Sequence, residues 1–216
     1  MPIGKNDSVL WLPKMPSDDK EMLKGIPKAI QGLHLYNQAL IAGSKQLGQV
    51  DEAQQIYLMG HGHEKLPGVK IDGSFWTAPQ IAKLLIDDGL KAGHGVLELL
   101  VCWAGASIGN AAYVQENMKV RDQWKAGKAT GADLQGRFDA MPRPKDFAAD
   151  SQLIPFAAAL MAAFKASAVP KFTKLRIFSY NKPVDMQTFD GGVHVNIPGG
   201  GKMRAVKNGA YWRQWL

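Results

Sequence analysis

Residues 56–62 read Ile-Tyr-Leu-Met-Gly-His-Gly and residues 96–102 read Val-Leu-Glu-Leu-Leu-Val-Cys, and these two apolar runs decide the fold. Short apolar runs of this kind are typical of strands buried on both faces of a sheet. One helix fits between them, with Thr77 as its N-cap. Two strands joined by a single helix run parallel in one sheet and end at the same edge. We therefore expect His61 and Cys102 to lie side by side beyond the ends of neighbouring strands.

The rest of the chain alternates between the signals of strands and helices. Strands are expected at residues 8–12, 53–60, 95–102 and 174–180, helices at 17–43, 78–93, 106–118 and 151–166, a turn-rich loop at 64–74 and a hairpin at 193–206. This alternation predicts an α/β fold with a mostly parallel central sheet and a small C-terminal β hairpin. In such sheets, binding sites form beyond the carboxyl ends of the strands, where His61 and Cys102 are expected.

The composition is that of an ordinary globular protein, with 46% hydrophobic and 21% charged residues. A length of 216 residues fits a single domain over residues 1–216. Residues 119–150 are rich in Lys, Arg, Asp, Gly and Pro, so we expect a mobile insertion at the surface there. The net charge is +7, but the basic residues are scattered and carry no recognisable nucleic-acid motif. We expect no specific nucleic-acid partner.

Cysteine usage and segment hydropathy exclude several further classes. Cys102 is the only cysteine, which excludes an internal disulfide and a cysteine-based zinc site. His61 and His63 form a His-x-His pair with no third ligand in view, so no metal is expected. Residues 1–14 lack a signal-peptide pattern, and no apolar stretch reaches the length of a membrane span. We expect a cytoplasmic protein, or one exported without a cleavable signal peptide.

The two apolar runs resemble the signature of the clan CD cysteine peptidases, which include caspases, gingipains, clostripain, separase and the self-processing domains of large bacterial toxins. In that clan an apolar strand ends in His-Gly, a helix follows, and a second apolar strand ends in the nucleophilic cysteine. Residues 56–62 and 96–102 match this order, with His61 and Cys102 41 residues apart. The resemblance covers residues 55–109. It departs from true caspases, because Leu-Val-Cys-Trp-Ala stands where they have Gln-Ala-Cys-x-Gly, and specificity for aspartate is therefore not implied.

This resemblance implies a caspase-like three-layer sandwich and a cysteine endopeptidase that cleaves protein or peptide substrates without a cofactor. Cys102 would attack the scissile carbonyl as a thiolate, and His61 would give a proton to the leaving amine. The backbone N–H groups of Gly62 and Cys102 would hold the oxyanion. The clan works as a dyad, so no third catalytic residue is required. The small size, the basic charge and the absence of a targeting signal fit a bacterial effector, and the resemblance also allows a self-processing protease.

Three aromatic residues are candidates for substrate binding. Trp76 and Trp103 flank the proposed site in the sequence and would either line a pocket or pack against the sheet. Tyr180 ends the strand expected at residues 174–180, at the same edge of the sheet. The resemblance implies that this region helps to shape the pocket for the residue before the cut bond.

Two other interpretations remain. Residues 105–109, Gly-Ala-Ser-Ile-Gly, fit the nucleophile elbow of an α/β-hydrolase. Ser107 would then be the nucleophile of a serine esterase or lipase, with His194 as the base and Asp185 or Asp190 as its orienting acid. His61 and Gly62 would belong to the oxyanion loop. The number of elements argues against this interpretation, because such hydrolases place another strand and two helices between that loop and the elbow. The third interpretation is a non-catalytic binding domain on the same fold.

Overall fold

The three-dimensional structure is a computed structural model that describes the greater part of the chain. The described residues are 3–4, 7–63, 66–102, 104, 155–167, 171–180, 184–186, 193–196, 202–204 and 212–215. The insertion expected at residues 119–150 and the helix expected at 106–118 lie outside them, as do Trp103, Ser107 and Asp190.

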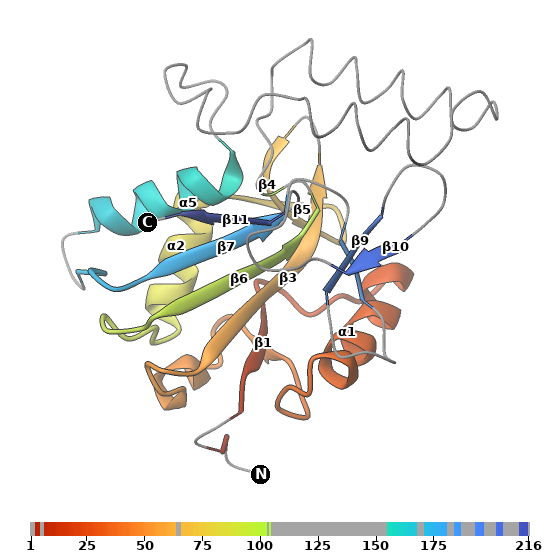
Figure 1. Cartoon of the computed structure of the whole chain (residues 1–216), viewed down its shortest axis with the longest axis horizontal. Coiled ribbons are helices and arrows are strands. Elements are labelled where there is room, and N and C mark those ends of the chain that lie inside the picture. Colours follow the sequence, from red (N-terminus) through yellow and green to blue (C-terminus); the bar gives the residue numbers. More distant parts are fainter. Residues whose placement is uncertain are drawn as a thin grey trace.

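The main sheet joins strands from both ends of the chain (Figure 1). Six of its strands follow the order β11-β7-β6-β3-β1-β2. Their bounds are β1 (Val9–Leu12), β2 (Leu40–Ile41), β3 (Gln55–His63), β6 (Val96–Val101), β7 (Arg176–Tyr180) and β11 (Trp212–Trp215). Five of these six, β1, β2, β3, β6 and β7, are mutually parallel, and β11 is antiparallel to β7. The predicted α/β fold with a mostly parallel sheet is thus confirmed.

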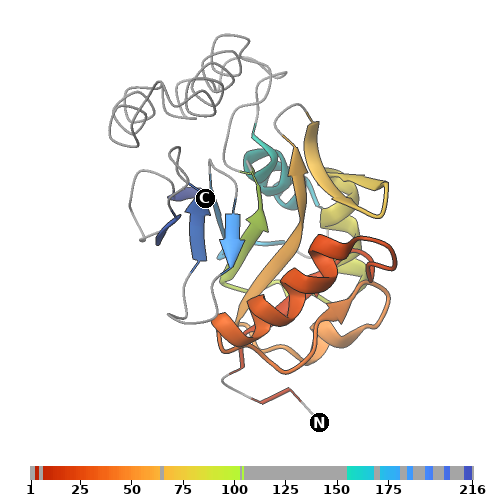
Figure 2. The same cartoon turned by 90° about the vertical axis from the view of Figure 1, so that its right-hand side faces the viewer.

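Helices cover both faces of this sheet (Figures 1 and 2). Helices α2 (Ala78–Asp87) and α5 (Phe156–Ala166) pack together on one face, and α1 (Lys20–Gly32) packs on the other. Strand β1 has no exposed side chain, and its residues alternate between the two hydrophobic cores. A central strand buried on both faces reads as a continuous apolar run, which is why residues 8–12 signalled a strand.

The prediction of a helix over residues 17–43 is wrong for the second half of this range. Helix α1 continues through Pro27 but ends at Gly32, and His34 takes the left-handed conformation with φ 52°. The N–H of Leu35 donates to the carbonyl of Ile30 at 2.9 Å, which closes a Schellman motif. The chain then forms β2 and a short 3₁₀ helix, η1 (Gln46–Gln49). The sequence gives no sign of this stop, because a histidine occupies the position that glycine usually takes.

The loop expected at residues 64–74 contains a hairpin instead. Strands β4 (Leu66–Ile71) and β5 (Ser74–Thr77) pair antiparallel, and β4 also pairs with the end of β3. Asp72 and Gly73 form the two-residue turn, with φ values of 46° and 77°. Positive φ at both positions is typical of the type I′ turn, for which Asp-Gly is a favoured pair. We call this element the Asp72 hairpin.

A second sheet joins three short strands near the C-terminus. Strands β8 (Val184–Met186), β9 (Val193–Asn196) and β10 (Lys202–Arg204) pair antiparallel in the order β10-β9-β8. Strand β8 contacts α1, so this sheet lies on the α1 side of the molecule (Figure 2).

Candidate functional site

The candidate site lies where the sheet changes its direction of winding. Strands β1 and β3 are neighbours, but β1 leads to α1 on one face and β3 leads through the Asp72 hairpin to α2 on the other. Connections that diverge in this way open a crevice at the carboxyl ends of the strands, where parallel α/β sheets bind their ligands. Asp19 follows β1 and His61 lies near the end of β3, so both residues belong to this crevice.

Two glycines flank His61 because other parts of the chain approach both positions closely. A Cβ atom at Gly60 would overlap with a side-chain methyl of Val69 in β4. A Cβ atom at Gly62 would overlap with the carbonyl oxygen of Cys102. Only glycine leaves room for these approaches. The Gly-His-Gly sequence is therefore a packing requirement at the point where β3 contacts both β4 and the end of β6.

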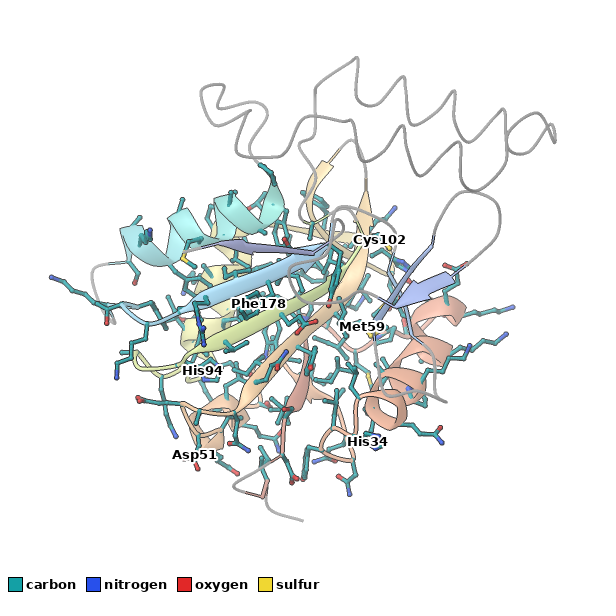
Figure 3. The ribbon with its side chains drawn as sticks, viewed as in Figure 1. His34, Asp51, Met59, His94, Cys102 and Phe178 are labelled. Atoms are coloured by element: carbon teal, nitrogen blue, oxygen red, sulfur yellow. The ribbon has the colours of Figure 1, made fainter. Side chains whose placement is uncertain are left out.

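The register of two strands places Cys102 next to His61. Strands β3 and β6 are paired in parallel over their common length, and the last pair is Gly60 opposite Val101. The next residues along the two strands are His61 and Cys102. Met59, two residues before His61, packs in the core on the α1 side, and strand alternation puts His61 on that face as well. Along β6, Leu100 packs in the same core, and Cys102 directly follows the last residue of this strand. Figure 3 shows Cys102 at this end of the sheet.

The segment that follows β6 is a tight turn fixed to the start of α5. The N–H of Ala104 donates to the carbonyl of Val101 at 3.2 Å, and the N–H of Ala157 donates to the carbonyl of Ala104 at 3.0 Å. Cys102 is the second residue of this four-residue turn and is half-buried. The backbone around the sulfur is therefore held from the strand on one side and from α5 on the other.

The His61 imidazole is paired with a carboxylate. Its Nε2 lies 2.7 Å from Oδ2 of Asp19, a distance typical of a charge-assisted hydrogen bond. The His61 side chain is 36% exposed and that of Asp19 is 14% exposed, so the pair lies at the mouth of the crevice. The other carboxylate oxygen of Asp19 accepts the N–H of Met22 at 3.0 Å and caps α1. Asp19 thus links the start of α1 to His61.

A second aspartate holds the loop that carries Asp19. The carboxylate of Asp72 accepts the backbone N–H groups of Ser17 at 2.6 Å, Asp18 at 3.2 Å and Asp19 at 2.9 Å. It also accepts the Ser17 hydroxyl at 3.1 Å and lies 3.6 Å from Nζ of Lys14. The hydrogen bond from the Ser17 N–H, with those from the other donors, lowers the pKa of Asp72 to about 2. Asp72 is therefore a fixed anion that fastens this loop to the Asp72 hairpin.

A cavity of about 480 Å³ opens beside His61. This volume lies within the range typical of small-ligand pockets. Its lining consists of Asp18, Asp19, His61, Gly62, Lys70, Asp72 and Gly73. Cys102 is not among these residues, so the cavity lies on the His61 side of the pair. Its walls come from the loop after β1, the end of β3 and the Asp72 hairpin.

The two described aromatic candidates lie elsewhere. Trp76 in β5 is partly buried, packs against both hydrophobic cores and does not line the cavity. Tyr180 is buried, and its hydroxyl donates to the carboxylate of Glu98 in β6. Burial and the neighbouring Glu98 charge raise the pKa of Tyr180 and of Tyr57, so both hydroxyls stay protonated. Gln55 also donates to Glu98, which makes this polar cluster part of the α1-side core.

The residues of the serine-hydrolase interpretation are described only in part. Ser107 and Asp190 lie outside the described residues. The register of β8 and β9 places Asp185 directly opposite His194. The stretch between β3 and β6 contains one helix, α2, together with the Asp72 hairpin. The sequence had indicated a single helix there, and this point is confirmed.

Sequence reasoning missed Asp19 and Asp72 as parts of the site. Residues 17–19 signalled only a helix N-cap, and the contact of Asp19 with His61 joins positions that are far apart in the chain. Asp72 carried a usable local signal, because Asp-Gly between two apolar stretches is a strong indication of a hairpin. The hydrogen bonds that Asp72 accepts from residues 17–19 are tertiary contacts, and no local sequence pattern predicts them.

Comparison of the sequence with protein-family models and with curated proteins finds no match. The site is therefore interpreted from its own geometry. In the described part of the chain, no three His, Cys, Asp or Glu side chains gather as a metal site requires. None of the described helices has the length and apolar character needed to cross a bilayer.

Proposed function

We propose that the protein is a cysteine peptidase in which Cys102 and His61 form the catalytic pair. The observation that carries the proposal is the parallel pairing of β3 and β6, whose register brings the two residues to neighbouring positions at one edge of the sheet. A cavity beside His61 and the partial exposure of its side chain support access by a substrate. The resemblance of residues 56–62 and 96–102 to the clan CD signature supports the same chemistry.

In the proposed reaction, His61 takes the thiol proton of Cys102, and the sulfur attacks the carbonyl carbon of the scissile amide. The tetrahedral intermediate collapses as the C–N bond breaks, and the His61 imidazolium gives its proton to the departing amine. Water then attacks the resulting thioester while His61 takes one of its protons. The acid product leaves and the thiol is restored. Backbone N–H groups of Gly62 and Cys102 would stabilise the oxyanion in both steps.

The fold proposed with this activity is the caspase-like three-layer sandwich. It is supported by a mostly parallel sheet that carries helices on both faces. Protein or peptide substrates are the class that this chemistry acts on. A C-terminal hairpin over residues 193–206 belongs to the same proposal.

The test is hydrolysis of a fluorogenic peptide library by the full chain, with autocleavage followed in parallel. We expect Cys102→Ala and His61→Ala to lower the rate by about 10²-fold or more, because each removes one half of the nucleophile–base pair. Ser107→Ala is the matched control and should retain the activity. Activity that survives Cys102→Ala but is lost in Ser107→Ala would overturn the proposal.

The serine-hydrolase interpretation remains a second candidate because Asp185 lies opposite His194 in the register of β8 and β9. An orienting carboxylate beside a base is what that mechanism requires. The presence of only one helix between β3 and β6 counts against it. A fluorophosphonate probe that labels Ser107, and fails to label His194→Ala, would favour this candidate over the cysteine peptidase.

A further inference from the structure

Beyond the dyad, the structure assigns Asp19 as a positioning residue that fixes the orientation and the tautomer of His61. This inference rests on the proposed function, since it concerns the base of the proposed pair. It starts from the 2.7 Å contact between Nε2 of His61 and Oδ2 of Asp19. A carboxylate only accepts hydrogen bonds, so the ring proton lies on Nε2 and leaves the lone pair of Nδ1 to face another group.

The Asp19 carboxylate has little freedom to turn away from His61. One oxygen is held by the N–H of Met22 in the first turn of α1. The backbone N–H of Asp19 is held by the carboxylate of Asp72 at 2.9 Å. These two contacts leave Oδ2 aimed at the imidazole. A base whose ring is oriented by a carboxylate, itself fixed by further hydrogen bonds, is the general arrangement of nucleophile–base–acid triads.

Two other observations support this role. Asp19 follows β1 and His61 lies near the end of β3, on opposite sides of the point where the sheet changes its winding direction. Their contact therefore bridges the crevice in which the cavity lies. The N-cap function of Asp19 does not require an aspartate, since serine and asparagine cap helices equally well. The contact with His61 is different, because a carboxylate can accept the Nε2–H with one oxygen while its other oxygen caps α1.

The test separates the role of Asp19 as a cap from its role as a partner of His61. Asp19→Asn keeps a capping oxygen for α1, but its amide group can donate to Nε2 and move the ring proton to Nδ1. Asp19→Ser keeps the cap and loses the contact with His61 altogether. The matched control is Asp51→Asn, which makes the same charge change at an exposed aspartate outside the cavity lining. Thermal unfolding verifies that each variant is folded.

The first measurement is ¹⁵N NMR of histidine-labelled full-length protein, which distinguishes the two tautomers without any reaction. We expect the Nε2–H form of His61 in the wild type and in Asp51→Asn, and the Nδ1–H form in Asp19→Asn. The second measurement is the rate at which iodoacetamide alkylates Cys102 at neutral pH. Asp19→Asn and Asp19→Ser should slow it by about 10-fold to 100-fold, whereas Asp51→Asn should leave it nearly unchanged.

The outcomes distinguish the two proposals. If His61→Ala slows alkylation of Cys102 while both Asp19 variants match the wild type, the dyad stands and the role of Asp19 is refuted. An unchanged tautomer in Asp19→Asn would refute it in the same way. If His61→Ala has no effect on alkylation, the catalytic pair itself fails, and the inference about Asp19 fails with it.

Discussion

At the scale of single residues, the site depends on how closely the backbone of β3 approaches the end of β6. Gly62 has no side chain, and the carbonyl oxygen of Cys102 occupies the space where a Cβ atom would stand. In the proposed peptidase, the backbone N–H of Gly62 would also help to hold the oxyanion. A change at this one position is therefore expected to affect both stability and chemistry.

We predict that Gly62→Ala destabilises the protein by about 1–3 kcal/mol, because the added methyl forces the two segments apart. For a chain of this length, each kcal/mol lowers the Tm by about 2–4 °C. Calorimetry measures this change, and the alkylation rate of Cys102 should fall as well. The matched control is Gly95→Ala, where the nearest atom to an added Cβ is the Glu52 carbonyl oxygen at 3.6 Å. Equal Tm values for the two variants would contradict the close approach.

The residue scale is also where sequence reasoning reached furthest. His61 and Cys102 were predicted as neighbours because each follows an apolar run, and the register of β3 and β6 agrees with that. Asp19 was predicted only as a helix cap, because capping leaves a local pattern and contact with a distant imidazole does not. A local signal reports what a residue does for its own segment, and the partner in space has to come from the fold.

At the scale of elements, the Asp72 hairpin shows how a turn can serve a distant loop. Its Asp-Gly sequence forms the turn, and the Asp72 carboxylate then fastens residues 17–19 through a set of N–H donors. The hairpin escaped prediction because residues 64–74 contain glycine and proline, which mask the apolar alternation of β4. The end of α1 escaped prediction because His34 adopts a conformation that the sequence does not signal.

The hydrogen bonds from the backbone of residues 17–19 to the Asp72 carboxylate predict a specific dependence of stability on pH. The pKa of Asp72 is lowered from 3.8 to about 2 in the folded protein, so the unfolded chain binds more protons between these values. The stabilisation from Asp72 is complete above about pH 3.8 and is lost as the pH falls toward about 2. Asp72→Asn keeps a residue that tolerates positive φ but removes the charge. It should therefore be less stable than the wild type at neutral pH, by an amount that shrinks in acid.

Urea unfolding of both proteins across the acid range measures this difference. Asp51→Asn serves as the control, because the Asp51 carboxylate is 55% exposed and lies 3.9 Å from Lys91. Such a surface pair contributes little, and this variant should follow the wild type at every pH. A gap between wild type and Asp72→Asn that stays constant down to about pH 2 would show that the Asp72 charge does not hold the loop.

At the scale of the whole molecule, the elements that hold the two halves of the site lie on opposite faces of the sheet. Helix α1 delivers Asp19 from one face of the sheet, while α5 steadies the turn that holds Cys102 from the other. The two layers can act on one site only if the central strands stay in register and the helices keep their places on the sheet. Contacts that tie distant segments across the molecule are thus expected to be costly to remove.

One of these contacts joins β1, the segment after β2 and the end of α2. Asp88 is fully buried and accepts the indole N–H of Trp11 at 2.8 Å and the backbone N–H of Lys45 at 2.6 Å. Removal of this carboxylate leaves two donors without their acceptor, and each such loss costs about 1–3 kcal/mol. We predict that Asp88→Ala lowers the free energy of unfolding by at least about 2 kcal/mol.

The neighbouring Asp87 provides the control for this prediction. Its carboxylate pairs with Lys83 one helical turn away at 2.6 Å, and both side chains are largely exposed. An exposed pair of this kind contributes at most about 0.5 kcal/mol, so Asp87→Ala should leave the free energy of unfolding nearly unchanged in denaturant titrations. A double-mutant cycle with Trp11→Phe isolates the indole contact, and we expect Trp11→Phe to cost less in the Asp88→Ala background than in the wild type. Equal costs in the two backgrounds would mean that β1 and α2 are held together by apolar packing alone.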